Sequence, residues 1–259
     1  MSKLSPCNSG VFCFSLFLGL QTASLGVFAE SKIETTTQPF TVKIGVSRVI
    51  YNPEGNGETL SVSNPQDYPA LIQTSVLGDD KKSKAPFVVM PPLFRLDGQQ
   101  QAHLRIVRTG GDFAKDRESL QWLCVRAIPP EASDEWGRGK NGKPAASDKV
   151  SMNLRISVST CIKLIIRPES VEGAQGDSDR QALTWQYQGG KLKVTNSSPR
   201  YMSLSSLKVG GKDIQDINYI PPLSSYDITL PNKNMGNKVQ WTIMDDYGGK
   251  SPVYEADIK

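Results

Sequence analysis

The clearest pattern in the chain is a run of alternating apolar and polar side chains that begins at Val150. Because successive side chains leave opposite faces of a pleated strand, an alternation of period two predicts a β-strand. After Thr160 the residues become almost continuously apolar, which is typical of a strand buried on both faces. The stretch up to Arg167 is therefore predicted to be one long strand with two environments. The apolar row of its alternating half consists of Val150, Met152, Leu154, Ile156 and Val158.

This apolar row has two interpretations. In the first, the row covers the core of its own domain, as the inward face of an ordinary strand does. In the second, the row offers large apolar side chains to another protein. The alternation is compatible with both interpretations, and other features of the chain have to decide between them.

Many shorter apolar runs of strand length fill the rest of the chain, and long helical periodicity is absent from it. The 17 prolines and 22 glycines fall between these runs, a punctuation that is typical of all-β sandwiches. Strands are predicted at Val46–Tyr51, Ala70–Leu77, Phe87–Met90, Leu104–Val107, Trp122–Val125, Leu183–Tyr187, Leu192–Thr195, Tyr201–Val209, Asp227–Leu230, Val239–Met244 and Val253–Ile258.

The spacing of these runs predicts two Ig-like β-sandwich domains. About seven strands precede Pro168, which is the number of one Ig-like sandwich. A linker-like composition follows at residues 168–180, so we expect an N-terminal domain at residues 30–167 and a C-terminal domain at residues 168–259. Residues 131–149 contain little that could pack and are predicted to form a long exposed loop before the central strand.

Residues 1–29 have the pattern of a cleaved secretory signal peptide. Lys3 is followed by a short apolar run and then by a small-x-small-like end at Ala29. Two of the four cysteines leave with this segment. An exported chain with two remaining cysteines most simply forms one disulfide, so we predict a bond between Cys124 and Cys161.

Charge and motif content argue against several function classes. The net charge of +4 is weak and scattered, so binding to nucleic acid is not expected. His103 is the only histidine, and neither a metal-ligand spacing nor a phosphate-binding glycine loop occurs in the sequence. No catalytic residue, metal, cofactor or nucleotide is therefore predicted, and only a carboxylate-based enzyme site stays open.

Two cations stand inside apolar runs, namely Arg48 and Lys163. A cation among apolar residues must either extend its head group to solvent or find an anion. An arginine and a lysine together would suit a carboxylate, because guanidinium and ammonium groups both donate to carboxylate oxygens. The two residues are candidates for a shared anion site, with solvent-exposed strand cations as the alternative.

Several motifs of the mature chain match a known family. They are Arg48-Val-Ile-Tyr, Asn64-Pro-Gln-Asp-Tyr-Pro, Pro91-Pro-Leu-Phe-Arg-Leu, Asp116-Arg-Glu-Ser-Leu-Gln-Trp-Leu-Cys-Val-Arg-Ala-Ile-Pro-Pro, Ile162-Lys-Leu-Ile-Ile-Arg-Pro and Asp246-Tyr-Gly-Gly. On these motifs the chain resembles the periplasmic chaperones of the chaperone–usher pathway. The cysteine pair and the long loop make it similar to the long-loop subfamily that includes the F1 capsule chaperone.

The resemblance implies roles for particular residues. The alternating row would complete a fimbrial or fibrillar subunit that lacks its last strand, a mode called donor strand complementation. Arg48 and Lys163 would anchor the C-terminal carboxylate of that subunit. Arg95, Glu118 and Asp246 would form an ion cluster that holds the two domains in an L or boomerang arrangement.

The resemblance also implies a place and partners. The protein would work in the periplasm of a Gram-negative bacterium and would deliver its subunit to an outer-membrane usher without a nucleotide. Self-association of the free chain stays open. Two alternatives are a secreted Ig-like adhesin or fibre subunit and a secreted hydrolase. A fibre subunit is disfavoured because the alternating strand is internal and two domains are predicted, and a hydrolase because no catalytic constellation was found.

Overall fold

The computed structural model describes residues 36–130, 134–137, 153–171, 173, 182–215, 219–232 and 235–259, with the backbone alone for residues 36–40, 137 and 153–156. The predicted signal peptide lies outside this part of the chain, and so do Val150 and Met152. Apart from two 3₁₀ turns at Glu135–Gly137 and Glu169–Val171, every regular element in the described part is a strand. The all-β prediction is therefore confirmed.

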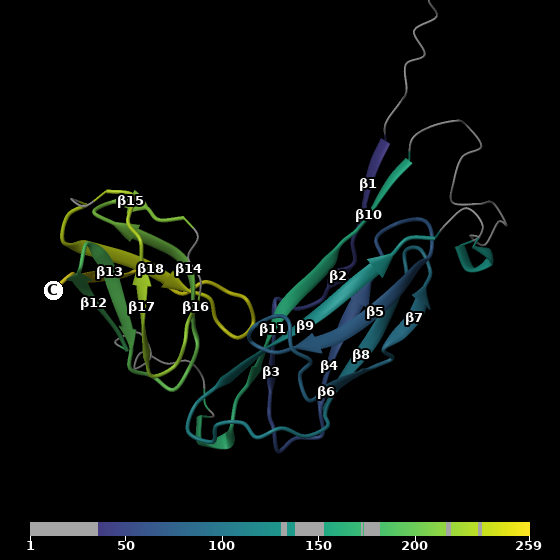
Figure 1. Cartoon of the computed structure of the whole chain (residues 1–259), viewed down its shortest axis with the longest axis horizontal. Coiled ribbons are helices and arrows are strands. Elements are labelled where there is room, and N and C mark those ends of the chain that lie inside the picture. Colours follow the sequence, from purple (N-terminus) through teal and green to yellow (C-terminus); the bar gives the residue numbers. More distant parts are fainter. Residues whose placement is uncertain are drawn as a thin grey trace, which may run out of the picture. The chain divides into compact units, whose positions relative to one another are not determined.

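The first half of the chain forms a sandwich of two sheets (Figure 1). One sheet has the order β3 (Arg48–Tyr51), β11 (Ser159–Ile166), β9 (Ser119–Ile128), β5 (Ala70–Leu77) and β7 (Leu93–Leu96). The other has the order β2 (Lys43–Ile44), β4 (Glu58–Ser63), β8 (Gln101–Arg108) and β6 (Phe87–Met90). Alternate side chains of both sheets meet in one core that includes the fully buried Ile72, Leu123, Val62 and Leu104.

The second half forms another sandwich with its own core. One sheet consists of β12 (Leu183–Gln188), β13 (Lys191–Asn196) and β17 (Ser224–Ile228). The other consists of β15 (Lys212–Asp213), β14 (Met202–Val209), β18 (Lys238–Ile243) and β19 (Tyr254–Asp257), and β16 (Tyr219–Ile220) pairs with the beginning of β14. The rings of Trp185 and Trp241, whose centroids lie 5.3 Å apart, fill the middle of this core.

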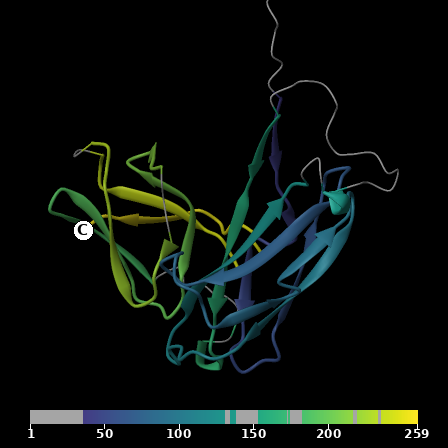
Figure 2. The same cartoon turned by 45° about the vertical axis from the view of Figure 1, so that its right-hand side comes forward.

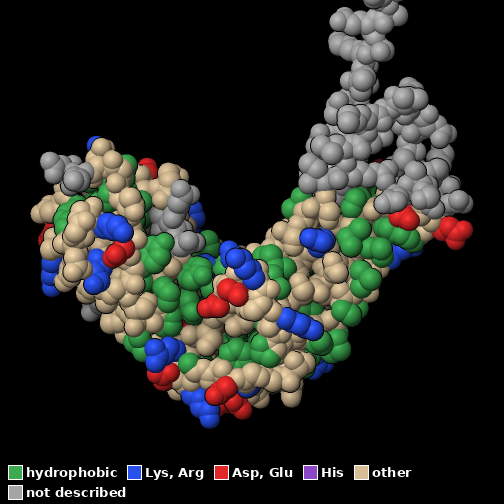
Figure 3. Space-filling model, in the orientation of Figure 1, with side chains coloured by type: hydrophobic (Ala, Val, Ile, Leu, Met, Phe, Trp, Pro, Cys, Tyr) green, Lys and Arg blue, Asp and Glu red, His purple; other side chains and the backbone are tan. Residues whose placement is uncertain are grey.

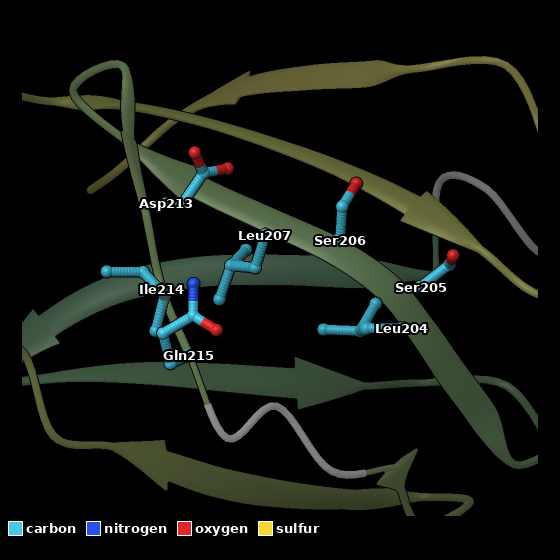
Figure 4. A pocket seen from close by; sticks show the side chains of 7 residues that line it. All are labelled: Leu204, Ser205, Ser206, Leu207, Asp213, Ile214 and Gln215. Carbon is cyan, nitrogen blue, oxygen red and sulfur yellow. The ribbon is translucent and has the colours of Figure 1, made fainter.

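A pocket of about 320 Å³ lies in the second sandwich (Figure 4). Its lining comes from β14 and from the residues around β15. Two of the polar groups there have partners: the hydroxyl of Ser206 is 2.7 Å from that of Thr242, and Asp213, the charged residue of the lining, pairs with Lys208 at 3.6 Å. The pocket therefore presents no free charge that would attract an ionic ligand.

The long central strand is divided at Val158 into β10 (Asn153–Ser157) and β11. β11 lies inside the five-stranded sheet, where it pairs with β3 in parallel and with β9 in antiparallel orientation. β10 instead pairs in parallel with β1 (Thr36–Phe40), and the two form a separate two-stranded sheet. Figures 1 and 2 show β1 and β10 running side by side beyond the rest of the first sandwich.

Candidate functional site

The two cations of the apolar runs are neighbours in the structure. Lys163 of β11 lies directly opposite Arg48 of β3, so their side chains share one face of the sheet. Arg48 is only 6% exposed, and its Nη1 donates to the carbonyl oxygen of Met244 at 3.3 Å. Its Nε is buried and has no hydrogen-bond partner among the described residues. Among the described residues, the guanidinium therefore has only the carbonyl oxygen of Met244 as a hydrogen-bond acceptor.

Residues of the second sandwich hold the ammonium group of Lys163. Its Nζ donates to Oγ of Ser203 at 2.9 Å and lies 4.9 Å from the centre of the Tyr219 ring. Ser203 and Tyr219 face each other in the β14–β16 pair, so one short ladder supplies both contacts. A cation over an aromatic face is attracted by the quadrupole of the ring, and the position of the ammonium is therefore defined.

The electrostatics of this pair favour binding of an anion. Burial lowers the pKa of Lys163 to about 8, with further lowering by the positive charges of Arg48 and Lys81. Burial likewise lowers the pKa of Arg48, against the opposing effect of Asp246 and two other acids. Within the described residues, no carboxylate forms an ion pair with either side chain. Two partly desolvated cations thus lie side by side, and the described residues place no carboxylate in direct contact with them.

A second group of charges joins the two sandwiches. Arg167 donates from Nε to Oε1 of Glu118 at 2.6 Å and from Nη1 and Nη2 to both oxygens of Asp246, at 2.7 and 2.8 Å. The other oxygen of Glu118 accepts the backbone N–H of Tyr201 at 2.7 Å. Glu118 and Asp246, both predicted for this cluster, are therefore brought together by a bidentate arginine.

Arg95 was also predicted for this cluster, and its place there stays a prediction. Arg95 lies on β7, the edge strand of its sheet, where its Nη2 pairs with Asp97 at 2.9 Å. The cation that contacts both carboxylates is Arg167, at the end of β11. Arg167 reaches Asp246 because the end of β11 lies beside the 244–249 turn, whereas β7 lies at the far edge of the same sheet from β3 and β11.

The turn that carries Asp246 has a defined backbone. Oδ1 of Asp245 accepts the N–H groups of Tyr247 at 2.9 Å and of Gly249 at 2.7 Å. Gly248 has φ +89°, and a Cβ at this position would lie 2.6 Å from Oγ of Ser47. The sequence Asp-Asp-Tyr-Gly-Gly therefore builds a tight turn that packs beside Arg48 and points Asp246 at Arg167.

The predicted disulfide between Cys124 and Cys161 is present, and the two residues lie directly opposite each other in the β9–β11 pair. The bond joins these strands close to the point where β10 leaves the sheet. There the hydroxyl of Ser157 donates to the carbonyl oxygen of Ala127 at 2.7 Å. The disulfide thus fixes β11 to β9 close to the base of β10, and the N–H of Ala127 adds a second hydrogen bond there, to the carbonyl oxygen of Val158 at 3.5 Å.

The structure describes the residues of the alternating row only in part. Val150 and Met152 lie outside the described residues, and for Leu154 and Ile156 only the backbone in β10 is described. Val158 is half-buried at the junction with β11. The role of this row therefore stays a prediction. In the described part of the chain, β1 is the only strand that pairs with β10, so one edge of β10 is open.

Other candidate sites are not built by the described residues. His103 is exposed on β8, and no group of His, Cys, Asp or Glu in that part of the chain could hold a metal ion. None of the helices in these residues has the length and apolar character needed to cross a membrane. On the face shown in Figure 3, Lys and Arg are interspersed with Asp and Glu, without a broad basic patch.

Sequence reasoning missed Arg167, Ser203 and Tyr219. A signal for Arg167 was available, because it ends the same apolar run that drew attention to Lys163. Ser203 and Tyr219 carry no comparable signal, since a serine and a tyrosine in short strands are ordinary residues of a sandwich. Their contact with Lys163 depends on the pairing of β14 with β16, which only the fold reveals.

Comparison with known proteins identifies the family. Residues 41–172 match the family described as "Pili and flagellar-assembly chaperone, PapD N-terminal domain", and residues 179–254 match "Pili assembly chaperone PapD, C-terminal domain". The chaperone protein AfaB of Escherichia coli is 51% identical over 217 residues, which cover 84% of this chain and 86% of the relative. The chaperone protein caf1M of Yersinia pestis is 41% identical over 235 residues, covering 89% and 90%.

A solved structure agrees with these matches. The structure entitled "Salmonella enterica SafA pilin in complex with the SafB chaperone" contains a chain that is 45% identical, with a TM-score of 0.74 and a coverage of 86% of this chain and 99% of that chain. A fibre subunit or a hydrolase, the other two interpretations of the sequence, would not match both chaperone domains. The chain therefore belongs to the family of pili assembly chaperones, a non-enzymatic family that assists the assembly of fimbrial subunits.

Proposed function

We propose that this chaperone lends β10 to an incomplete fimbrial subunit and anchors the C-terminal carboxylate of that subunit on Arg48 and Lys163. The observation that carries the proposal is this cation pair. The two side chains lie opposite each other, hold a free Nε donor and contact no carboxylate within the described chain. A polypeptide terminus supplies the compact, singly charged carboxylate that such a pair binds.

The open edge of β10 supports the second half of the proposal. β11 has partners on both edges, so it cannot accept a further strand. β10 continues from β11 with β1 on one edge only, and a strand of the subunit can add to the other edge by β-augmentation. The sequence alternation would then direct Val150, Met152, Leu154, Ile156 and Val158 into the core of the subunit.

The carboxylate anchor and the open edge of β10 together would determine the register between β10 and the strand of the subunit. A carboxylate fixed at Lys163 determines which residue of the subunit lies beside each residue of β10. A slip by one residue would present the polar row instead of the apolar row. Burial of five large apolar side chains contributes roughly 8–15 kcal/mol before the cost of association is subtracted. The anchor therefore sets the register, and the apolar row supplies most of the binding energy.

The remaining steps rest on the family and on the N-terminal segment. We propose that residues 1–29 direct the chain to the periplasm and are removed there, and that the chaperone delivers its subunit to an outer-membrane usher. The SafA pilin in complex with the SafB chaperone supports a fimbrial subunit as the partner. Exchange of the lent strand for a segment of the next subunit would release the chaperone without a nucleotide.

Co-purification from the periplasm tests this function. A tagged chaperone is produced together with the fimbrial subunit of the same gene cluster, and the recovered subunit is quantified. We expect Lys163→Met and the double variant Leu154→Asp with Ile156→Asp each to lower recovery at least about tenfold. Lys163→Met removes the charge of the anchor, and the double variant would place two carboxylates in the apolar core of the subunit.

The polar row of the same strand offers a matched control. Ser151→Asp with Asn153→Asp introduces the same two charges two residues apart and should leave recovery unchanged. Thermal unfolding of every free variant shows whether the chaperone itself is folded. Undiminished recovery with the Leu154 and Ile156 variant would disprove strand donation, and undiminished recovery with Lys163→Met would disprove the anchor.

A further inference from the structure

We propose that Lys81 is a third cation of the carboxylate site formed by Arg48 and Lys163, an inference that rests on the proposed anchor function. Lys81 is an exposed residue in the turn between β5 and β6. Nothing in its sequence environment distinguishes it from its neighbours Lys82 and Lys84. Its contacts in the structure do distinguish it.

Aromatic rings connect Lys81 to the anchor. Its Nζ lies 3.9 Å from the centre of the Trp122 ring. Trp122 is the residue directly opposite Lys163 in the β9–β11 pair, and its ring packs against Tyr219 with 6.2 Å between centroids. Since Lys163 lies over Tyr219, the two ammonium groups occupy neighbouring aromatic faces.

The backbone of the turn holds Lys81 in this place. Oδ1 of Asp80 accepts the N–H groups of Lys82 at 2.8 Å and of Ser83 at 2.9 Å. The N–H of Lys81 itself donates to the carbonyl oxygen of Gly78 at 3.0 Å, and Lys81 has φ +56°. Nε1 of Trp122 donates to the carbonyl oxygen of Asp79 at 3.3 Å, which fastens the turn to β9.

The charge of Lys81 acts on the anchor. It contributes to the lowered pKa of Lys163, after burial and after Arg48. Three like charges in one region repel each other, and a carboxylate that enters between them relieves part of this repulsion. A third cation also extends the positive potential towards solvent, where an approaching carboxylate first meets it.

A purely structural role for Lys81 is the competing explanation. Its methylene groups could simply cover the Trp122 ring, as long cationic side chains often cover apolar surface. The two explanations differ in one respect. If Lys81 only covers the Trp122 ring, its effect on affinity does not depend on the charge of the ligand. If Lys81 helps to bind the carboxylate, its effect requires the negative charge at the end of the subunit.

Two peptides separate the explanations. Both copy the last strand of the subunit that co-purifies with the chaperone; one ends in a free carboxylate and the other in an amide. Their dissociation constants are measured at low salt for the full mature chaperone and for Lys81→Ala, Lys81→Arg and Lys82→Ala. We expect Lys81→Ala to weaken binding of the carboxylate peptide about fivefold and to leave the amide peptide unaffected.

The control variants complete the test. Lys81→Arg keeps the charge and should restore most of the affinity, and Lys82→Ala removes the same charge from the same turn without effect. Equal losses for both peptides, or equal values for Lys81→Ala and Lys82→Ala, would overturn the role of Lys81 alone. If the wild-type chaperone does not distinguish carboxylate from amide, the anchor itself fails, and the role of Lys81 fails with it.

Discussion

Replacement of Arg167 by methionine tests whether the ion cluster at Glu118 and Asp246 joins the two sandwiches. The arginine side chain is 9% exposed and that of Glu118 1%, and three short hydrogen bonds link the guanidinium to the two carboxylates. Methionine fills much of the same space without a charge, so two acids lose their counter-ion. We expect the free energy of unfolding at neutral pH to fall by roughly 3–5 kcal/mol.

The pH dependence of this loss has a defined sign. In the wild type, burial alone would raise the pKa of Asp246, but the hydrogen bonds and charge of Arg167 lower it below its ordinary value. The stabilisation from Asp246 is therefore present above about pH 4 and is lost as the pH falls below that value. The pKa of Glu118 is raised, because burial outweighs Arg167 and the N–H of Tyr201.

In the methionine variant, burial still raises the pKa values of both acids, and the opposing effect of Arg167 is lost. The N–H of Tyr201 and the more distant arginines oppose burial only in part, so both pKa values should rise in the folded state, which then binds more protons. The variant should therefore gain stability as the pH falls from 7 towards 5, and the difference from the wild type should shrink. Glu118→Gln added to the variant should recover part of the loss at pH 7, since an amide needs no counter-ion.

Urea unfolding at several pH values, followed by tryptophan fluorescence, measures these differences. Arg117→Met is the matched control, because Arg117 pairs with Asp116 at 3.0 Å but is 43% exposed. Solvent screens an exposed pair, which contributes little to stability, so this control should resemble the wild type. If Arg167→Met costs no more than Arg117→Met, or if its cost does not change with pH, the cluster is not a buried charge network.

Two further predictions concern the anchor and the disulfide. Burial lowers the pKa of the partly exposed Lys163 to about 8 in the folded state. Between pH 8 and 10 the unfolded state therefore binds more protons at this residue than the folded state does. The stability of the free chaperone should then rise over this range. Subunit affinity should fall over the same range as the ammonium loses its charge; pH titrations of both quantities check this, and a Lys163→Arg variant that behaves identically would contradict it. Replacement of Cys124 and Cys161 by serine should lower the stability by roughly 3–4 kcal/mol. It should also weaken subunit binding by freeing the base of β10; an unchanged affinity in a pull-down would limit the bond to a stabilising role.

Much of the strand content follows from local patterns. Ala70–Leu77 and Phe87–Met90 were predicted with the bounds that the structure gives to β5 and β6, because each is a short run rich in apolar residues with turn residues at both ends. β7 was missed, since Pro91 and Pro92 were interpreted as a stop. The carbonyl of Pro92 instead accepts the N–H of Thr74, so the prolines enter an edge strand that needs no donor on its outer side.

The site was only partly predictable for a similar reason. A cation in an apolar run is a local anomaly, and this signal selected Arg48 and Lys163 before any geometry was known. The partners of these cations come from the other half of the chain, through the β14–β16 pair and the 244–249 turn. Such contacts depend on tertiary register, which leaves no periodic trace in the sequence. The contacts of Arg167 with Glu118 and Asp246 have the same origin.

The division of the central strand at Val158 explains why one continuous segment can carry two tasks. β11 has a neighbour on each edge, so its side chains hold a fixed position, as an anchor for a chain terminus requires. β10 has left that sheet and, among the described strands, pairs with β1 alone, which leaves one edge for the strand donation that we propose. The disulfide and the Ser157 hydrogen bond lie between the two halves and fix their connection. A subunit whose carboxylate binds at Lys163 would therefore lie at a defined offset from the donor strand. Because the junction between β11 and β10 is fixed, the position of this carboxylate would determine the register of the subunit along β10.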